Sequence, residues 1–299
     1  MSSTVWSTRA SATPEVRLPR TFWRDTGQAL RRQKAALLGL ALVGLVILAA
    51  LIGQVGVPES ANRTNLAQRL SGPSPQHVLG TDGAGRDILQ RVLLGAPLSL
   101  AVGVVAVAIG SVLGSLQGLI AGFRGGLLGS VIMRFTDAML AFPTLLFALA
   151  IIATLGPGLS NVMIAVGLTS MPRFTRVMHA EVLSLRNRDY VLAARSLGAT
   201  TPTILWRHIL PNAMSSVLVL STLSVSTAIL AEATLSFLGL GPRPPTATWG
   251  AMISDGTSVL QVAPWVVLFP GLAITLTVLG FSLFGDGLRD ALDVRLRDR

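Results

Sequence analysis

The 299-residue sequence has no cysteine, a single lysine and three histidines, and only 13% of its residues are charged. Without cysteine the chain forms no disulfide, no thiolate metal site and no thiol nucleophile. The lysine, Lys34, follows Gln33 and lacks the glycines and the hydroxyl residue of a Walker A motif. HExxH metal motifs and GxSxG nucleophile elbows are also missing. We therefore expect a chain that is not an enzyme, with no catalytic residue, no metal site and no cofactor of its own.

Apolar residues make up 51% of the chain, which is typical of an integral membrane protein. The net charge of +10 comes mostly from arginines placed between apolar runs, a pattern that favours a membrane protein and not a nucleic-acid-binding one. The first apolar run follows a long polar tail and exceeds the ~7–15 residues of a signal-peptide core, so we expect it to remain as an anchor.

The apolar runs predict an all-α polytopic fold with six transmembrane helices. Residues 1–34 form a tail that ends in an amphipathic helix, 35–55 the first span, and 56–97 a polar extracytoplasmic segment with a helix start near Asp87. Residues 98–285 hold a five-helix core, and 286–299 form a second tail. The core spans are expected at 98–121, at 138–155 with a kink near Pro143, from 159 past Pro172, at 213–240 and at 262–284.

Glycines at every fourth position, from Gly110 to Gly122, put small residues on one face of the second span. This stripe predicts the close approach of another helix, and tight packing is the simplest explanation for it.

Basic residues divide unequally between the two sides of this topology. With both termini in the cytoplasm, 19 arginine and lysine residues lie on the cytoplasmic side and 5 on the other. By the positive-inside rule, both tails and the loop at residues 173–212 are cytoplasmic. The expected location is a bacterial cytoplasmic (inner) membrane, crossed several times.

Within this loop, residues 189–211 read as a helix, a break at Gly198 and a second helix that starts near Pro202. The segment joins two spans directly, so a push on it would move both. A plain amphipathic hairpin is the alternative interpretation.

Glu232 is the only carboxylate inside an apolar span, and an ionisable group there is a functional candidate. It is either hydrated near the outer interface, or paired with Arg243 or a partner chain, or the ion site of a secondary transporter. The same span is rich in small hydroxyls, which favours a helix bordering a cavity. The residues expected to line a pathway are Ser221, Ser224, Thr227 and Glu232.

Five segments, in order, resemble the C-type permease subunit of the bacterial dipeptide, oligopeptide and nickel ABC importers. They are HVLGTDGAGRDILQRVLLGAPLSL (77–100), RFTDAMLAFPTLL (134–146), the 189–211 segment, EATLSFLGLGPRPPTATWGAMI (232–253) and GDGLRDALDVRLR (285–297). The resemblance implies a type I ABC importer permease fold. It also implies a B-type permease partner, two ABC ATPases that bind ATP and Mg, and an extracytoplasmic binding protein.

The 189–211 segment resembles the cytoplasmic coupling motif of this family, with Leu192 where the family has a glutamate. The resemblance therefore implies that an ATPase docks on this segment more through apolar contacts than through ion pairs. The implied coupling residues are Arg188, Asp189, Tyr190, Leu192, Ala193, Ala194, Arg195, Gly198, Ala199, Leu210 and Pro211. The residues expected to face the binding protein are Asp82, Arg86, Asp87 and Trp249.

The expected function is ATP-driven peptide import, with this chain forming half of the pathway. Nickel, glutathione or sugar import is an alternative, as is a secondary transporter driven through Glu232. A membrane assembly subunit without a substrate is a further alternative.

Overall fold

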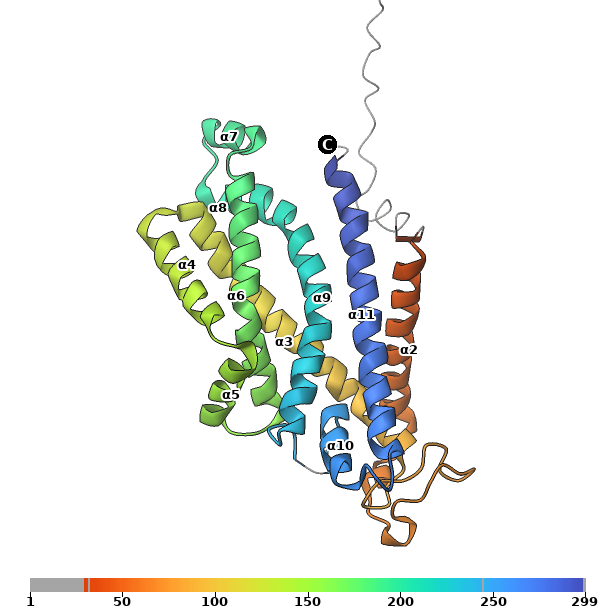
Figure 1. Cartoon of the computed structure of the whole chain (residues 1–299). Helices are drawn as coiled ribbons and strands as arrows, with labels where there is room; N and C mark the ends of the chain where they lie inside the picture. Colours follow the sequence, from red (N-terminus) through yellow and green to blue (C-terminus); the bar gives the residue numbers. More distant parts are fainter. Residues whose placement is uncertain (1–29, 32, 244, 298–299) are drawn as a thin grey trace, which may run out of the picture.

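The computed structural model describes residues 30–31, 33–243 and 245–297, which form helices joined by turns and one longer polar segment (Figure 1). Most of the predicted amphipathic tail, residues 1–34, lies outside the described residues. Within the described part of the chain there is no β-strand, only an isolated bridge between Thr81 and Asp87. The helices are α2 (Lys34–Gly56), α3 (Ile88–Arg124), α4 (Gly126–Ala141), α5 (Thr144–Leu155), α6 (Leu159–Leu185), α7 (Asp189–Ser196), α8 (Thr201–Ile204), α9 (Leu210–Phe237), α10 (Trp249–Gly256) and α11 (Trp265–Arg297).

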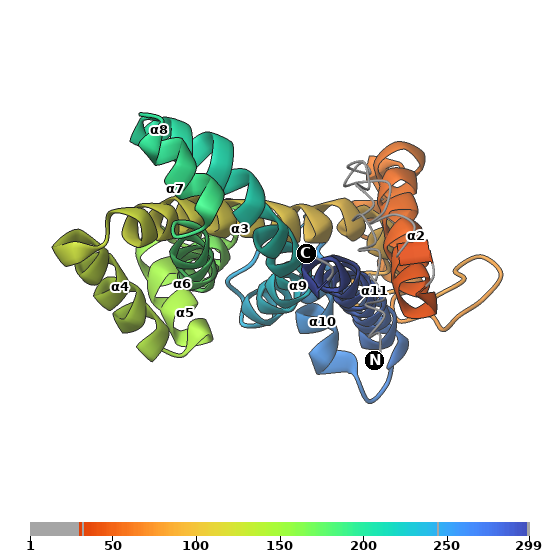
Figure 2. The same ribbon diagram turned by 90° about the horizontal axis from the view of Figure 1, so that it is seen from above.

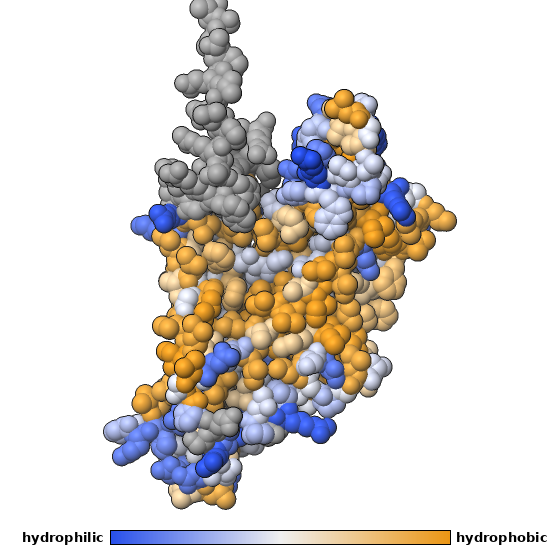
Figure 3. Space-filling model, turned by 180° about the vertical axis from the view of Figure 1, so that it is seen from behind, coloured by the Kyte–Doolittle hydropathy of each residue, from blue (hydrophilic) through white to orange (hydrophobic). Residues whose placement is uncertain are grey.

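On the face that Figure 3 shows, a belt of apolar side chains lies between two polar ends. Four helices among the described residues are long and apolar enough to cross a membrane, and α4 with α5 adds a fifth if that bent pair is one span. The remaining expected span, the fourth in chain order, corresponds to α6, which is long enough but is apolar only in its first half. As predicted, α6 continues through Pro172.

The two polar ends differ in what they contain. The α7 end carries α7, α8 and the last turns of α11, and the α10 end carries α10 and the polar segment at residues 57–87 (Figure 1). The names α7 end and α10 end are used below for these two regions.

Helix α3 is the longest element and crosses the whole bundle, from α2 to α4, when seen from above (Figure 2). It begins at Ile88, earlier than the span expected from residue 98, and runs through Pro97 without a break. Its 37 residues reach about 55 Å, longer than a ~30 Å hydrocarbon core, so the helix is tilted or projects beyond it. The Asp87 carboxylate caps its first turn by accepting from the Gln90 backbone N–H at 2.9 Å, as the sequence predicted.

The glycine stripe of α3 packs directly against the backbone of α6. A methyl group added at Gly114 would collide with the Met171 carbonyl of α6, and one at Gly118 with the Thr175 carbonyl. Larger residues on this face would separate the two backbones. The predicted packing role of the stripe is confirmed.

The third expected span is a sharply bent pair and not a single kinked helix. Helices α4 and α5 meet at an angle of 96°. Phe142 takes an extended conformation before Pro143, which has no N–H to continue the hydrogen-bond ladder. The expected kink near Pro143 is therefore present, as a 96° bend between two helices.

The second tail continues a span as helix. Helix α11 runs without interruption from Trp265 to Arg297, so most of residues 286–299 extends the last span. The span itself begins at Trp265, after Pro264, and not at residue 262.

Candidate functional site

The α7–α8 segment has the helix, break and second helix that its sequence predicted. Helix α7 ends at Ser196, and Gly198 adopts a φ of +79°, a left-handed conformation that favours glycine. The N–H of Ala199 donates to the Ala194 carbonyl at 3.0 Å and closes the end of the helix. Asp189 in the first turn and Arg195 in the last turn both complement the helix dipole.

Buried apolar side chains fix this segment to the bundle. Val191, Ile204 and Ile209 are fully or almost fully buried and belong to the main core cluster. The guanidinium of Arg195 lies 5.9 Å from the centre of the Phe123 ring, at the end of α3. The segment is therefore packed against the bundle and is not a loose loop.

The opposite face of the segment is exposed and partly apolar. Leu192, which stands in place of the family's glutamate, is 44% exposed, and Leu197 is 88% exposed. Tyr190 and Trp206 are also exposed. Such a patch at a polar end, away from the apolar belt, is typical of a protein interaction surface. The other predicted coupling residues divide between exposed (Arg188, Asp189, Ala193, Arg195, Gly198, Pro211) and half-buried (Ala194, Ala199, Leu210).

A π-helical turn at Leu205–Ile209 links α8 to α9, a feature that sequence reasoning missed. Pro211 follows this turn in the first turn of α9 and has no N–H to donate, so a local change of helical register is expected there. The only sequence signal was the proline itself, within ILP.

The predicted pathway residues of α9 have different surroundings. Ser224 is buried, Ser221 is half-buried and donates to the Val217 carbonyl, and Thr227 is exposed. Glu232 is 1% exposed, and its Oε1 accepts from the Ser236 hydroxyl at 2.7 Å. Its Oε2 has no hydrogen-bond partner, and Glu232 and Arg243 form no ion pair. The alternative in which Glu232 pairs with Arg243 is therefore not found in this structure.

Sequence reasoning missed a polar contact between α9 and α11. The Ser226 hydroxyl donates to the Val278 carbonyl at 3.1 Å, and the Ser282 hydroxyl bonds to Ser226 at 3.1 Å. Part of the serine content of α9 therefore serves helix packing, which the residue types alone do not distinguish from a cavity lining.

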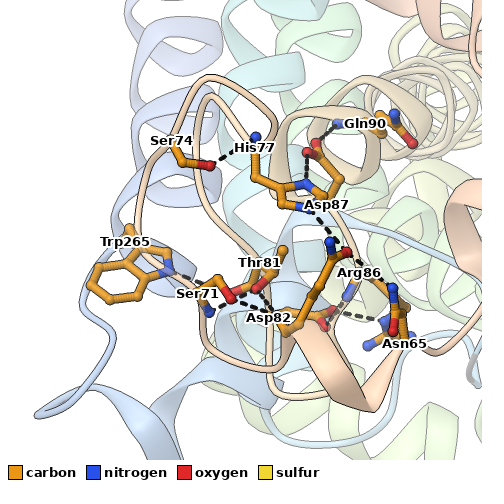
Figure 4. A network of polar contacts seen from close by, with 11 residues as sticks. Asn65, Ser71, Ser74, His77, Thr81, Asp82, Arg86, Asp87, Gln90 and Trp265 are labelled. Atoms are coloured by element: carbon orange, nitrogen blue, oxygen red, sulfur yellow. Dashed lines mark hydrogen bonds and ion pairs between the residues drawn. The ribbon is translucent and has the colours of Figure 1, made fainter.

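At the α10 end, Asp82 organises a compact polar network (Figure 4). Its Oδ1 accepts from the backbone N–H groups of Ala84 and Arg86 at 2.8 and 2.9 Å, and its Oδ2 accepts from Arg86 Nε at 2.7 Å. The Asp87 carboxylate also bonds to His77 Nδ1 at 2.8 Å. These contacts hold the polar segment against the start of α3.

Two of the residues expected to face a binding protein lie in the interior instead. Trp249 is 1% exposed and donates from its indole to the Val92 carbonyl at 2.9 Å. Asp82 is buried, while Arg86 and Asp87 are half-buried. In this structure Trp249 fixes α10 to α3 and does not form an outer surface.

The chain matches two known families over most of its length. Residues 110–298 match "Binding-protein-dependent transport system inner membrane component", and residues 21–73 match "N-terminal TM domain of oligopeptide transport permease C". The chain is 45% identical to the dipeptide transport system permease protein DppC of Alkalihalophilus pseudofirmus, over 92% of this chain and 90% of that protein. It is 46% identical to the glutathione transport system permease protein GsiD of Escherichia coli, over 93% and 92%.

Two solved structures share the fold at low sequence identity. An inward-facing MetNI methionine ABC transporter aligns with a TM-score of 0.55 at 18% identity, covering 67% of this chain and 96% of that one. An amino acid ABC transporter aligns with a TM-score of 0.50 at 19% identity, covering 64% and 89%. The chain therefore belongs to the inner membrane components of binding-protein-dependent transport systems, as a C-type permease of the peptide and nickel ABC importers.

Proposed function

We propose that this permease forms half of the pathway of an ATP-driven importer of di- or oligopeptides. The similarity to a dipeptide permease at 45% identity over nearly the whole chain supports peptide as the cargo. Glutathione is the second candidate, because glutathione permeases are equally similar, and it is chemically a small peptide. The other half of the pathway comes from a B-type permease.

The observation that carries this proposal is the exposed apolar face of a bent segment anchored in the core. One of the two ATPase subunits of the importer, which bind ATP and Mg, docks on Leu192, Leu197 and their neighbours at the α7 end. Because Val191 and Ile209 are buried in the main core, a displacement of α7 is transmitted to α3 and α9. The chain itself makes and breaks no covalent bond.

This mechanism places the α7 end and both termini in the cytoplasm. The α10 end then faces outward, where a binding protein delivers the substrate. The count of basic residues on the two sides supports this orientation.

The coupling role is tested with the full complex reconstituted in proteoliposomes. Gly198→Trp places a bulky residue at a φ of +79°, and Ala194→Asp places a charge on a half-buried helix position. Gly126→Trp is a matched control, because Gly126 also has a positive φ, of +56°, is exposed, and has open space around it. We expect both coupling variants to lose peptide uptake and substrate-stimulated ATP hydrolysis in an assembled complex, while the control retains them.

Three results would contradict the proposal. The first is normal uptake in both coupling variants. The second is uptake without ATPase subunits that an ion gradient drives and Glu232→Gln abolishes, which would identify a secondary transporter. The third is a complex that takes up neither di- and oligopeptides nor glutathione, which would overturn the cargo but not the coupling.

A further inference from the structure

Two neighbouring cavities lie at the α10 end and share part of their walls. The first has a volume of about 270 Å³, between the polar segment, α10 and the start of α11. The second, of about 150 Å³, lies under the loop that joins α9 to α10. Arg91 and Asp255 line both cavities. The cationic residues around them are Arg86, Arg91 and Arg243.

Arg91 is the unusual member of this group, because it is 2% exposed and incompletely bonded. Its Nη1 donates to the Asn62 side chain at 3.2 Å, but its Nε makes no hydrogen bond. A buried charged donor without an acceptor is costly and is usually completed by a ligand, an ion or water. Arg91 lines both cavities, where such a group would fit beside the buried guanidinium.

The nearby carboxylates do not supply a hydrogen-bond acceptor for Arg91 Nε. Asp82 Oδ2 lies 3.5 Å from Arg91 Nε, but this oxygen already accepts from Arg86 Nε at 2.7 Å. Asp255 Oδ2 lies 3.9 Å from Arg86 Nη2, too far for a hydrogen bond. The two cavities are therefore lined by three arginines and only two carboxylates, Asp82 and Asp255.

The donor chemistry and the size point to one class of ligand. A guanidinium binds carboxylates with a planar pair of N–H donors. The larger cavity is near the lower end of the ~300–1,000 Å³ typical of small-molecule sites. Asp255 has a half-exposed side chain at the rim, where it would attract an ammonium group and repel a dianion such as phosphate.

We propose that the Arg91 cavity binds a small amino-carboxylate, with the carboxylate on Arg91 and Arg243 and the ammonium on Asp255. A free amino acid or a dipeptide has both groups within the span of the site. The site lies within one chain, apart from the α7 end. Only the choice of a dipeptide as probe rests on the proposed function.

The test measures binding of radiolabelled dialanine to the full transporter complex in lipid nanodiscs, without the binding protein and without nucleotide. We expect saturable binding to the natural chain, weakened at least tenfold by Arg91→Gln and several-fold by Arg243→Gln and Asp255→Asn. Arg69→Gln is the matched control, because Arg69 is an exposed arginine of the polar segment that lines neither cavity. Dialanine amide, which lacks the carboxylate, should not compete, and N-acetyl-dialanine should compete weakly.

Because Arg91 is buried, the Arg91→Gln complex could fail to assemble, and the exposed variants Arg243→Gln and Asp255→Asn then decide the matter. Four results would each overturn the site. The first two are the absence of saturable binding and equal competition by dialanine amide. The others are binding that requires the binding protein, and equal binding by Arg243→Gln, Asp255→Asn and Arg69→Gln. A natural complex that transports peptides but does not bind dialanine here would refute the site and leave the proposed function standing. A complex that binds dialanine but transports no peptide would do the opposite.

Discussion

The two polar ends of this permease are built in opposite ways. At the α7 end, large apolar side chains such as Leu192 and Leu197 are exposed on a short helix and its C-terminal turn. The buried side chain of Val191 packs this helix against the core. At the α10 end, charged side chains are buried, and Asp82 gathers two backbone N–H groups and the Arg86 side chain. The segment around Leu192 and Leu197 exposes apolar surface, and the segment around Asp82 encloses charged groups.

This difference indicates that the α7 end is a docking surface and that the α10 end is a network that fixes the positions of chain segments. An exposed apolar patch gains stability when a partner covers it. A buried hydrogen-bond network fixes one arrangement of the segments that it joins. We therefore expect substitutions at the α7 end to affect partner assembly more than folding, and substitutions at the α10 end to affect folding first.

The largest effect is expected for Asp82→Ala at the α10 end. The change removes the acceptor of Arg86 Nε and leaves two largely buried arginines without their nearest carboxylate. Loss of one partner of a buried ion pair costs about 3–5 kcal/mol, so the purified chain should unfold at a clearly lower denaturant concentration. Arg69→Ala, on the same polar segment, should leave the transition where it was. Equal stability of the two variants would mean that the buried network around Asp82 does not stabilise the α10 end, and the contrast with the α7 end would fail.

A smaller effect is expected for Leu192→Asp at the α7 end. A charge on this exposed residue should leave the unfolding transition unchanged but weaken ATPase binding by about tenfold, or roughly 1.4 kcal/mol. Leu66→Asp is the matched control, because Leu66 is an exposed leucine at the α10 end. The measurement is the affinity of detergent-solubilised permease for ATPase subunits. A loss with Leu66→Asp as large as with Leu192→Asp would argue against docking at α7.

The smallest effect is expected for Asp87→Ala, which removes the cap of α3 and the partner of His77. Loss of a helix cap typically costs about 1 kcal/mol. The variant should unfold slightly earlier than the natural chain and still bind the ATPase subunits with unchanged affinity. A large assembly defect would mean that the α10 end also controls docking.

Features set by a few neighbouring residues could be predicted from the sequence. The break at Gly198 requires only a residue that tolerates positive φ, and the cap of α3 requires only Asp87 and the N–H of Gln90. The glycine stripe that ends at Gly122 also predicted close helix packing, because small residues at every fourth position lie on one helix face.

Features set by distant contacts could not be predicted in this way. Arg91 bonds to Asn62, 29 residues earlier, and the Trp249 indole bonds to Val92, 157 residues earlier. The residues that neighbour Trp249 in the sequence do not reveal this contact, so the sequence alone favoured an outer surface for it. Pro143 predicted a kink, but the proline alone does not fix the 96° angle between α4 and α5.

The most direct test of the central claim uses the absence of cysteine from this chain, which allows single cysteines to be placed at either end. Leu197→Cys and Val78→Cys put exposed thiols at the α7 and α10 ends, respectively. The assembled complex is treated with a short thiol-to-amine crosslinker, and the products are identified by mass spectrometry. The account predicts a crosslink from position 197, and none from position 78, to an ATPase subunit. A crosslink to the ATPase from position 78, with none from position 197, would contradict it.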